Sequence, residues 1–128
     1  MKKILLDTTA YSYLRNGNSD VLDAIAQAEQ VYISIVTLGE LYVGFRGGKK
    51  QKKNLRILNN FINSQSVNVL NTSNETAEFY AEIKINLKKA GTPLPTNDIW
   101  IAAHVFETGS TLITYDKHFQ KIPGLMIW

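Results

Sequence analysis

Short apolar segments alternate with helix-like segments along almost the whole chain, and this alternation limits the possible folds more than any other feature. Strands are expected at residues 2–6, in the first part of 31–36, at 67–70, at 111–114 and, as a last short strand, at 125–128. Helical patterns separate most of them. Such an order predicts an α/β fold, with a mainly parallel sheet covered by helices on both faces.

Local signals place several helix ends. Ser34 is expected to cap a helix that ends at Gly47 and Gly48, and Thr96 to cap a helix that ends at Gly109. The chain has 128 residues, which we interpret as one domain spanning 1–128. It has no cysteine, and no segment approaches the ~20 apolar residues of a membrane span. The N-terminal apolar run is interrupted by Asp7, which argues against a signal peptide.

The basic residues are unevenly distributed. The net charge is only +3, but no acid occurs between Glu40 and Glu75. The same interval holds six basic residues, Arg46, Lys49, Lys50, Lys52, Lys53 and Arg56. This segment is either a solvated surface or a contact for the phosphates of RNA, and the sequence leaves both open.

Four acids lie where a parallel α/β sheet would place a ligand, outside the carboxyl ends of its strands. Asp7 ends the first strand and Asp116 follows the fourth, while Glu40 and Asp98 lie on helices that begin near strand ends. Each has an ordinary explanation: a helix cap for Asp7, a favourable helix dipole for Asp98, an Asx turn for Asp116 and solvent exposure for Glu40.

The four acids together favour a different interpretation. Carboxylates that converge repel one another unless a cation lies between them. Hard divalent cations such as Mg²⁺ bind through one or two carboxylates and retain water for a phosphate to displace. The pattern therefore indicates a Mg²⁺ or Mn²⁺ site, and the basic segment indicates a polyanionic substrate.

Three stretches carry a family resemblance: "LLDTTAYSYL" at 5–14, "SIVTLGELYVGF" at 34–45 and "TNDIWIAAHVFETGSTLITYDKHF" at 96–119. They resemble the PIN-domain ribonucleases, in particular the VapC-like toxins of prokaryotic toxin–antitoxin pairs. The resemblance implies a three-layer α/β/α fold with a mainly parallel central sheet of about four to five strands. It also implies a cytoplasmic endoribonuclease that depends on Mg²⁺ or Mn²⁺.

The resemblance also assigns roles to residues. Asp7, Glu40, Asp98 and Asp116 match the family's catalytic and metal-binding acids. Thr114 matches a hydroxyl residue that orients these carboxylates, and we expect supporting roles for Thr8 and Asn97 beside the acids.

The family further implies partners. We expect an RNA substrate, a VapB-like antitoxin that inserts an arginine or lysine among the acids, a homodimer, and a larger assembly with the antitoxin. The alternative is a non-catalytic RNA-binding or antitoxin-sequestered domain, against which the intact acids argue. An aspartyl-phosphate phosphatase would need a second Asp where Thr9 stands.

Other residues with reactive or aromatic side chains have structural interpretations. We expect His104 to be packed or partly exposed, and His118 to make a local contact. Trp100, Phe106, Tyr11 and Tyr13 are predicted to belong to the core, although the two tyrosines are near enough to the acids to touch RNA.

Overall fold

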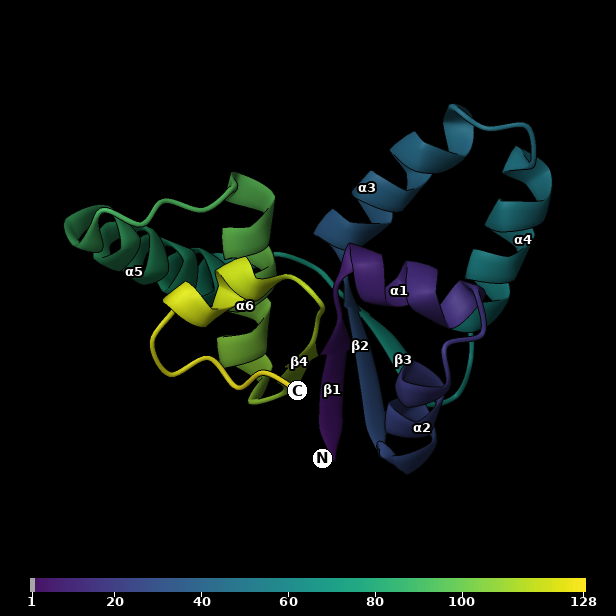
Figure 1. The fold of residues 1–128 in the computed structure, drawn as a ribbon, viewed down its shortest axis with the longest axis horizontal. Coiled ribbons are helices and arrows are strands. Elements are labelled where there is room, and N and C mark those ends of the chain that lie inside the picture. Colours follow the sequence, from purple (N-terminus) through teal and green to yellow (C-terminus); the bar gives the residue numbers. More distant parts are fainter. Residues whose placement is uncertain (1) are drawn as a thin grey trace.

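The computed structural model describes residues 2–128 and has a four-stranded, fully parallel sheet at its centre, in the order β3-β2-β1-β4 (Figure 1). The strands are β1 (Lys3–Leu6), β2 (Gln30–Ser34), β3 (Val67–Leu70) and β4 (Thr111–Ile113). The predicted parallel sheet is confirmed. The expected last strand is reduced to one bridge, between Ile127 and Leu112, because only that residue pairs with the short edge strand β4.

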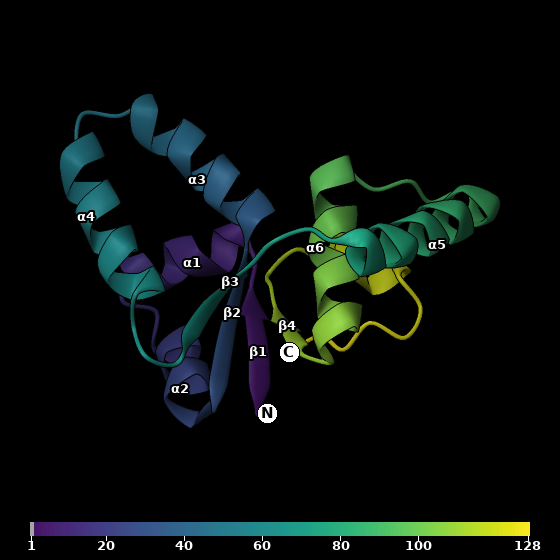
Figure 2. The ribbon, with the colours of Figure 1, turned by 180° about the vertical axis from the view of Figure 1, so that it is seen from behind.

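Helices cover both faces of the sheet, which gives the predicted three-layer α/β/α arrangement (Figures 1 and 2). They are α1 (Thr8–Arg15), α2 (Ser19–Gln27), α3 (Ile35–Arg46), α4 (Gln51–Ile62), α5 (Asn74–Ala90) and α6 (Thr96–Thr108), followed by a short 3₁₀ helix, η1 (Lys117–Lys121). No helix in residues 2–128 has the length and apolar character needed to cross a membrane.

The core forms two clusters, one on each face of the sheet, and β1 contributes to both. Ile4 and Leu6 pack with residues of α1–α4, whereas Leu5 packs with residues of α5 and α6. All three are fully buried. A strand buried on both faces requires an unbroken apolar run rather than an alternating one, which explains the sequence "ILL" before Asp7.

The order of the strands determines where the site lies. From β1 the chain proceeds outward to β2 and β3, and it then returns across the sheet to place β4 on the other side of β1. The strand order therefore reverses between β1 and β4, whose carboxyl ends lie side by side. This is the position at which parallel α/β sheets bind ligands.

One expected helix cap is wrong. Thr96 is the first residue inside α6, and the capping position is Pro95, which makes no side-chain capping bond. The carbonyl of Pro95 instead accepts the first helical bonds, from the N–H groups of Asp98 and Ile99. By contrast, the Ser34 hydroxyl accepts from the Val36 N–H at 3.0 Å, and Gly109 ends α6 in a left-handed conformation, both as predicted.

Candidate active site

Asp7 lies at the junction of β1 and α1, and it is held by both neighbouring elements. One carboxylate oxygen accepts from the N–H of Ala10 at 2.8 Å and so caps α1. The other accepts from the hydroxyl of Thr114, which directly follows β4. The side chain is almost fully buried, so it has one fixed position at the carboxyl end of the sheet.

Glu40 reaches the same region from α3. Its Oε1 accepts from the Thr8 hydroxyl at 2.6 Å, and Thr8 is the first residue of α1, next to Asp7. The carboxyl group of Glu40 is therefore held against the start of α1 from the middle of a different helix. The supporting position expected for Thr8 corresponds to this bond.

Asp116 and His118 form the third part of the site, on the turn after β4. The N–H of Asp116 donates to the Thr114 hydroxyl at 3.0 Å, so Thr114 bridges Asp116 and Asp7. The Asp116 carboxylate caps η1 through the N–H of His118 at 2.9 Å. The His118 Nδ1 also lies 3.0 Å from an oxygen of this carboxylate.

Asp98 lies in the first turn of α6 and is half-buried. Burial, first, and the nearby charges of Asp116, Glu40 and Asp7 together raise the pKa of its carboxyl group to about 6. The imidazole of His118 opposes this shift. Asp98 is therefore coupled electrostatically to the other three acids.

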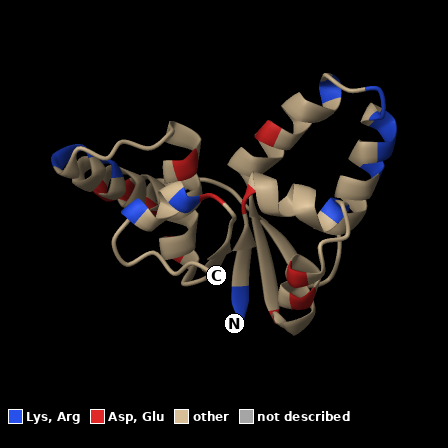
Figure 3. Ribbon diagram, in the orientation of Figure 1, with Lys and Arg blue, Asp and Glu red and all other residues tan. Residues whose placement is uncertain are grey.

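Asp7 shows the same coupling. Burial is the main cause that raises its pKa, with smaller contributions from the charges of Asp116 and Glu40. The hydrogen bonds from Thr114 and the Ala10 N–H lower it and only partly offset these effects. We refer to Asp7, Glu40, Asp98 and Asp116 as the acidic site. The junction of β1 and α1, helices α3 and α6, and the turn after β4 each contribute one of these carboxylates (Figure 3).

The acidic site is not a closed ligand set. In residues 2–128, no three histidine, aspartate or glutamate side chains lie close enough to hold a metal ion together. A site of four neighbouring but separated carboxylates nevertheless matches the chemistry of Mg²⁺, which takes one or two carboxylates directly and reaches other groups through water. The donor set is all oxygen, as hard divalent cations prefer.

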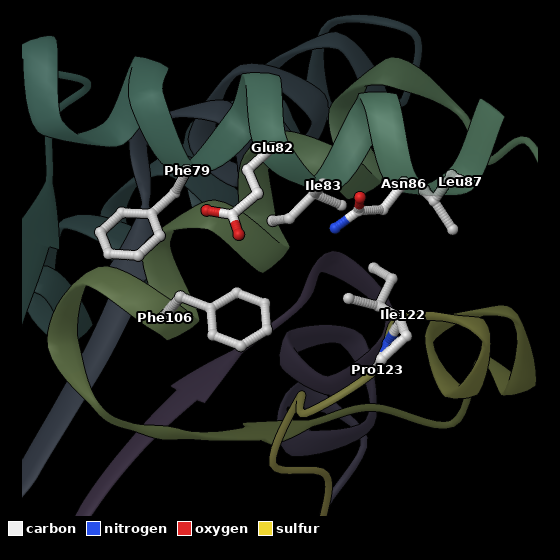
Figure 4. Close-up of a pocket in the computed structure, with 8 residues that line it drawn as sticks. All are labelled: Phe79, Glu82, Ile83, Asn86, Leu87, Phe106, Ile122 and Pro123. Atoms are coloured by element: carbon white, nitrogen blue, oxygen red, sulfur yellow. The ribbon is translucent and has the colours of Figure 1, made fainter. Parts of the chain in front are cut away.

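A better-enclosed cavity occurs elsewhere, between α5 and the segment that follows η1 (Figure 4). It has a volume of about 200 Å³ and is lined by Phe79, Glu82, Ile83, Asn86, Leu87, Phe106, Ile122 and Pro123. None of the four acids lines it, and it contains only one carboxylate. The acidic site, not this cavity, is therefore the candidate active site.

Comparison with known proteins gives the family. The PIN domain family matches residues 4–125, which is nearly the whole chain. The chain belongs to the PIN-domain family. The ribonuclease VapC1 of Haemophilus influenzae (strain R2866) is 30% identical over 126 residues, covering 94% of this chain and 92% of the relative.

Two further relatives extend the comparison. The tRNA(fMet)-specific endonuclease VapC of Salmonella typhimurium (strain LT2) is 28% identical, and the match covers 99% of this chain and 97% of that protein. The crystal structure of DNA-bound VapBC from Salmonella typhimurium has a chain that superposes with a TM-score of 0.87 at 28% identity, covering 100% of this chain and 98% of that one. The similarity in sequence and in fold thus spans this PIN domain from end to end.

The expected RNA contacts lie apart from the acidic site of this PIN domain. The basic segment, residues 46–56, comprises the end of α3, the connection between α3 and α4 and the first half of α4, at the end of these helices that is remote from the sheet (Figure 3). All six of its basic side chains are exposed. Asn97 is also exposed and makes no side-chain hydrogen bond within residues 2–128.

The structure agrees with the predictions for Tyr11, His104 and His118 in this PIN domain and contradicts the prediction for Tyr13. Tyr11 is buried as predicted, but Tyr13 is 39% exposed, so its assignment to the core is wrong. His104 is fully buried, and His118 makes the expected local contact. The position of His118 two residues after Asp116 was the sequence signal for its place beside the acids. The prediction of a local contact did not include this role.

Proposed function

We propose that this PIN domain is a divalent-metal-dependent endoribonuclease that acts as the toxin of a VapBC-like pair in a prokaryotic cytoplasm. The observation that carries the proposal is that Thr114 links Asp7 to Asp116 and Thr8 holds Glu40 beside Asp7. Burial and the neighbouring acids raise the pKa of both Asp7 and Asp98 there. Four carboxylates in one region are unfavourable for the folded protein alone and favourable for binding a cation.

The side chains of the site have distinct roles in this scheme. Asp7 and Asp98 hold the cation, Asp116 assists them, and Glu40 completes the arrangement. Thr114 fixes the orientation of Asp7, while Thr8 fixes that of Glu40. A bound Mg²⁺ or Mn²⁺ supplies charge neutralisation at the phosphate and activates water for in-line attack.

RNA is the proposed substrate because two similar proteins are named for it, one as a ribonuclease and one as a tRNA(fMet)-specific endonuclease. The extent of the match supports carrying over the reaction class, hydrolysis of RNA phosphodiester bonds. The alternative is a domain that binds RNA without cutting it. An assay of RNA cleavage separates the nuclease from this alternative.

The test is cleavage of a mixed RNA pool with Mg²⁺, with Mn²⁺ and with EDTA. We expect cleavage only with a divalent metal, and its loss in Asp7→Asn and Asp98→Asn proteins whose circular dichroism matches the wild type. Glu78→Gln, an exposed acid on α5, is the matched control for removal of one charge. Full activity in both aspartate variants would overturn the metal assignment, and RNA binding without cleavage would favour the alternative.

The charge of the acidic site also supports a specific kind of inhibitor. An arginine fits a carboxylate cluster because its planar guanidinium pairs with two oxygens and keeps its charge. We propose that a VapB-like antitoxin places an arginine or lysine among the acids, in a complex of toxin dimers. Co-expression with the adjacent small gene should give a silent complex that recovers nuclease activity when the antitoxin tail is proteolysed. A complex that cuts RNA as fast as the free protein would contradict this.

The basic segment is proposed to bind RNA phosphates at a distance from the chemistry. Replacing Lys49, Lys50 and Lys52 with glutamine should weaken RNA binding and reduce its salt dependence, because fewer counterions are released. Replacing Lys84, Lys88 and Lys89 on α5 removes the same charge elsewhere and is the control. Equal salt dependence in the two triple variants would identify the basic segment as an ordinary solvated surface.

A further inference from the structure

Three aromatic side chains form a connected patch on the surface of this domain. The rings of Tyr13 and Tyr115 meet edge-to-face at a centroid distance of 4.2 Å, and those of Tyr115 and Trp128 do so at 5.6 Å. All three residues are 37–40% exposed. Large aromatic rings of a core are normally covered, so three touching rings that remain open to solvent indicate a binding surface.

The aromatic patch (Tyr13, Tyr115 and Trp128) is linked to the acidic site through the backbone. Tyr115 lies between Thr114, whose hydroxyl binds the Asp7 carboxylate, and Asp116. Tyr13 belongs to α1, the helix that Asp7 caps. The patch and the acids are therefore carried by the same two segments of the chain, α1 with its cap and the turn after β4.

The patch is held in a fixed arrangement. The Tyr115 hydroxyl lies 3.3 Å from the side-chain oxygen of Asn18, the residue that caps α2. The backbone N–H of Trp128 donates to the Leu112 carbonyl on β4 at 2.9 Å. Rings fixed in this way lose little conformational freedom when a flat ligand stacks on them.

We propose that the aromatic patch is a stacking platform for unpaired bases of the RNA that enters the acidic site. This rests on the proposed ribonuclease function and adds to it the residues that would contact the bases of the bound RNA. Bases in a duplex are stacked on one another and cannot lie on protein rings, whereas unpaired bases stack on tyrosine and tryptophan with little preference for sequence. The basic segment would attract the backbone, and the aromatic patch would select strands with exposed bases.

The platform is tested by comparing two strands of equal length and charge in EDTA, which prevents cleavage. One is a mixed-sequence single-stranded RNA, and the other has abasic sites in its central positions. We expect Tyr13→Ala, Tyr115→Ala and Trp128→Ala each to weaken binding of the first strand about tenfold, with a smaller effect on the second. Tyr13→Phe retains a ring and should bind as the wild type does. Ile85→Ala, an exposed apolar residue on α5, is the control.

A second measurement compares the two strands on the wild-type protein, so this comparison does not depend on the folding of any variant. Trp128 is exposed, whereas the other tryptophan, Trp100, is half-buried and stacked on Tyr80. A base stacked on Trp128 should quench its fluorescence, so the RNA with bases should quench and the abasic strand should not. The quenching should be lost in Trp128→Phe.

Three results would overturn the platform. One is unchanged affinity in the alanine variants, and another is an equal loss for the two strands. The third is an alanine variant that sediments as a monomer where the wild type sediments as a dimer, with no base-dependent change in RNA binding. This result would assign the patch to the contact with a second copy of the chain. Binding in EDTA is independent of cleavage. A protein that cuts RNA but shows no base-dependent binding refutes only the platform, and one that stacks bases but never cuts refutes only the nuclease.

Discussion

Two groups of polar residues in this domain contain carboxylates, and they differ in how the charge is stabilised. At one end of α5 and α6, Glu107 accepts from the Thr76 hydroxyl at 2.8 Å and 3.0 Å and from the Ser73 hydroxyl at 3.2 Å. The Nδ1 of His104 lies 3.3 Å from the same carboxylate. We call Ser73, Thr76, His104 and Glu107 the Glu107 cluster.

Among the residues that the structure describes, the acidic site does not have a hydrogen-bond donor for each of its carboxylates. Within residues 2–128, no donor bonds the carboxylate of Asp98, and its strongest neighbours are other acids. Asp7 has two donors, yet burial still raises its pKa. A carboxylate surrounded by donors stabilises the fold by itself, whereas carboxylates that face one another are stabilised by a cation. The comparison therefore marks Glu107 as an acid stabilised within the fold and Asp98 as one that a cation would stabilise.

The largest expected effect comes from changing one acid in each group. Asp98→Asn should reduce RNA cleavage at least ~100-fold, because metal binding contributes several kcal/mol to such reactions. In EDTA the same variant should be more stable than the wild type, because a repelling charge is removed. Glu107→Gln should leave cleavage unchanged and lower the free energy of unfolding by about 1–2 kcal/mol, since hydrogen bonds to a charged group are replaced by neutral ones.

Cleavage assays and urea unfolding in EDTA measure the two quantities on the same samples. Glu78→Gln should change neither. The comparison fails if Asp98→Asn is destabilised in EDTA, or if Glu107→Gln loses activity while remaining folded.

Metal binding gives the second largest effect. Mg²⁺ at 100 times its dissociation constant should raise the free energy of unfolding by about 2.7 kcal/mol, because it binds only the folded site. Asp98→Asn should lose most of this gain, and Glu107→Gln should keep it. Urea unfolding with Mg²⁺ and in EDTA, at matched ionic strength, gives the difference directly. Equal stabilisation of both variants would place the cation outside the acidic site.

Thr114 tests how one donor adjusts the acidic site. Its hydrogen bond lowers the pKa of Asp7 against the effect of burial, so Thr114→Val should raise that pKa further. A hydrogen bond to a charged group stabilises the charged form, so its loss favours the protonated carboxyl group. The acidic limb of the pH–rate profile should move to higher pH. Thr114→Ser retains the hydroxyl and should restore the wild-type profile; equal profiles for the valine and serine variants would show that the bond has no such role.

Much of the acidic site is predictable from the sequence because its position follows from the order of strands and helices. Asp7 directly follows β1 and Asp116 lies three positions after the end of β4, and the reversal of strand order between β1 and β4 brings these ends together. The contacts that tune the site were not predictable. The bond from Thr8 to Glu40 spans 32 positions and depends on how α1 and α3 approach each other.

The exposure of Tyr13 and the Glu107 cluster were missed for the same physical reason. Helical periodicity indicates which face of α1 is apolar, but it does not show that the Tyr13 ring meets Tyr115, 102 positions away, at the surface. Glu107 and Thr76 come from two helices whose packing creates the cluster. Local patterns thus predicted the elements and their ends, while side-chain partners between elements required the structure.

The smallest expected effect is the pH dependence of stability, and its sign distinguishes the two groups of residues. The pKa of Asp98 is about 6 in the folded protein, above the usual value of 3.8. Between these values the folded state binds more protons than the unfolded state, so this group makes the protein less stable as pH rises from about 4 to 6. Burial lowers the pKa of His104 below 6.5, so His104 acts in the opposite direction and removes stability as pH falls below that value. Subtracting the unfolding free energy of the wild type from that of Asp98→Asn, both in EDTA, cancels the contribution of His104. The difference should grow from pH 4 to 6 and become constant above about pH 7, with a modest amplitude because Asp98 is half-exposed and water screens its charge. A difference that stays flat across this range would show that burial and the neighbouring acids do not raise the pKa of Asp98 in the folded protein.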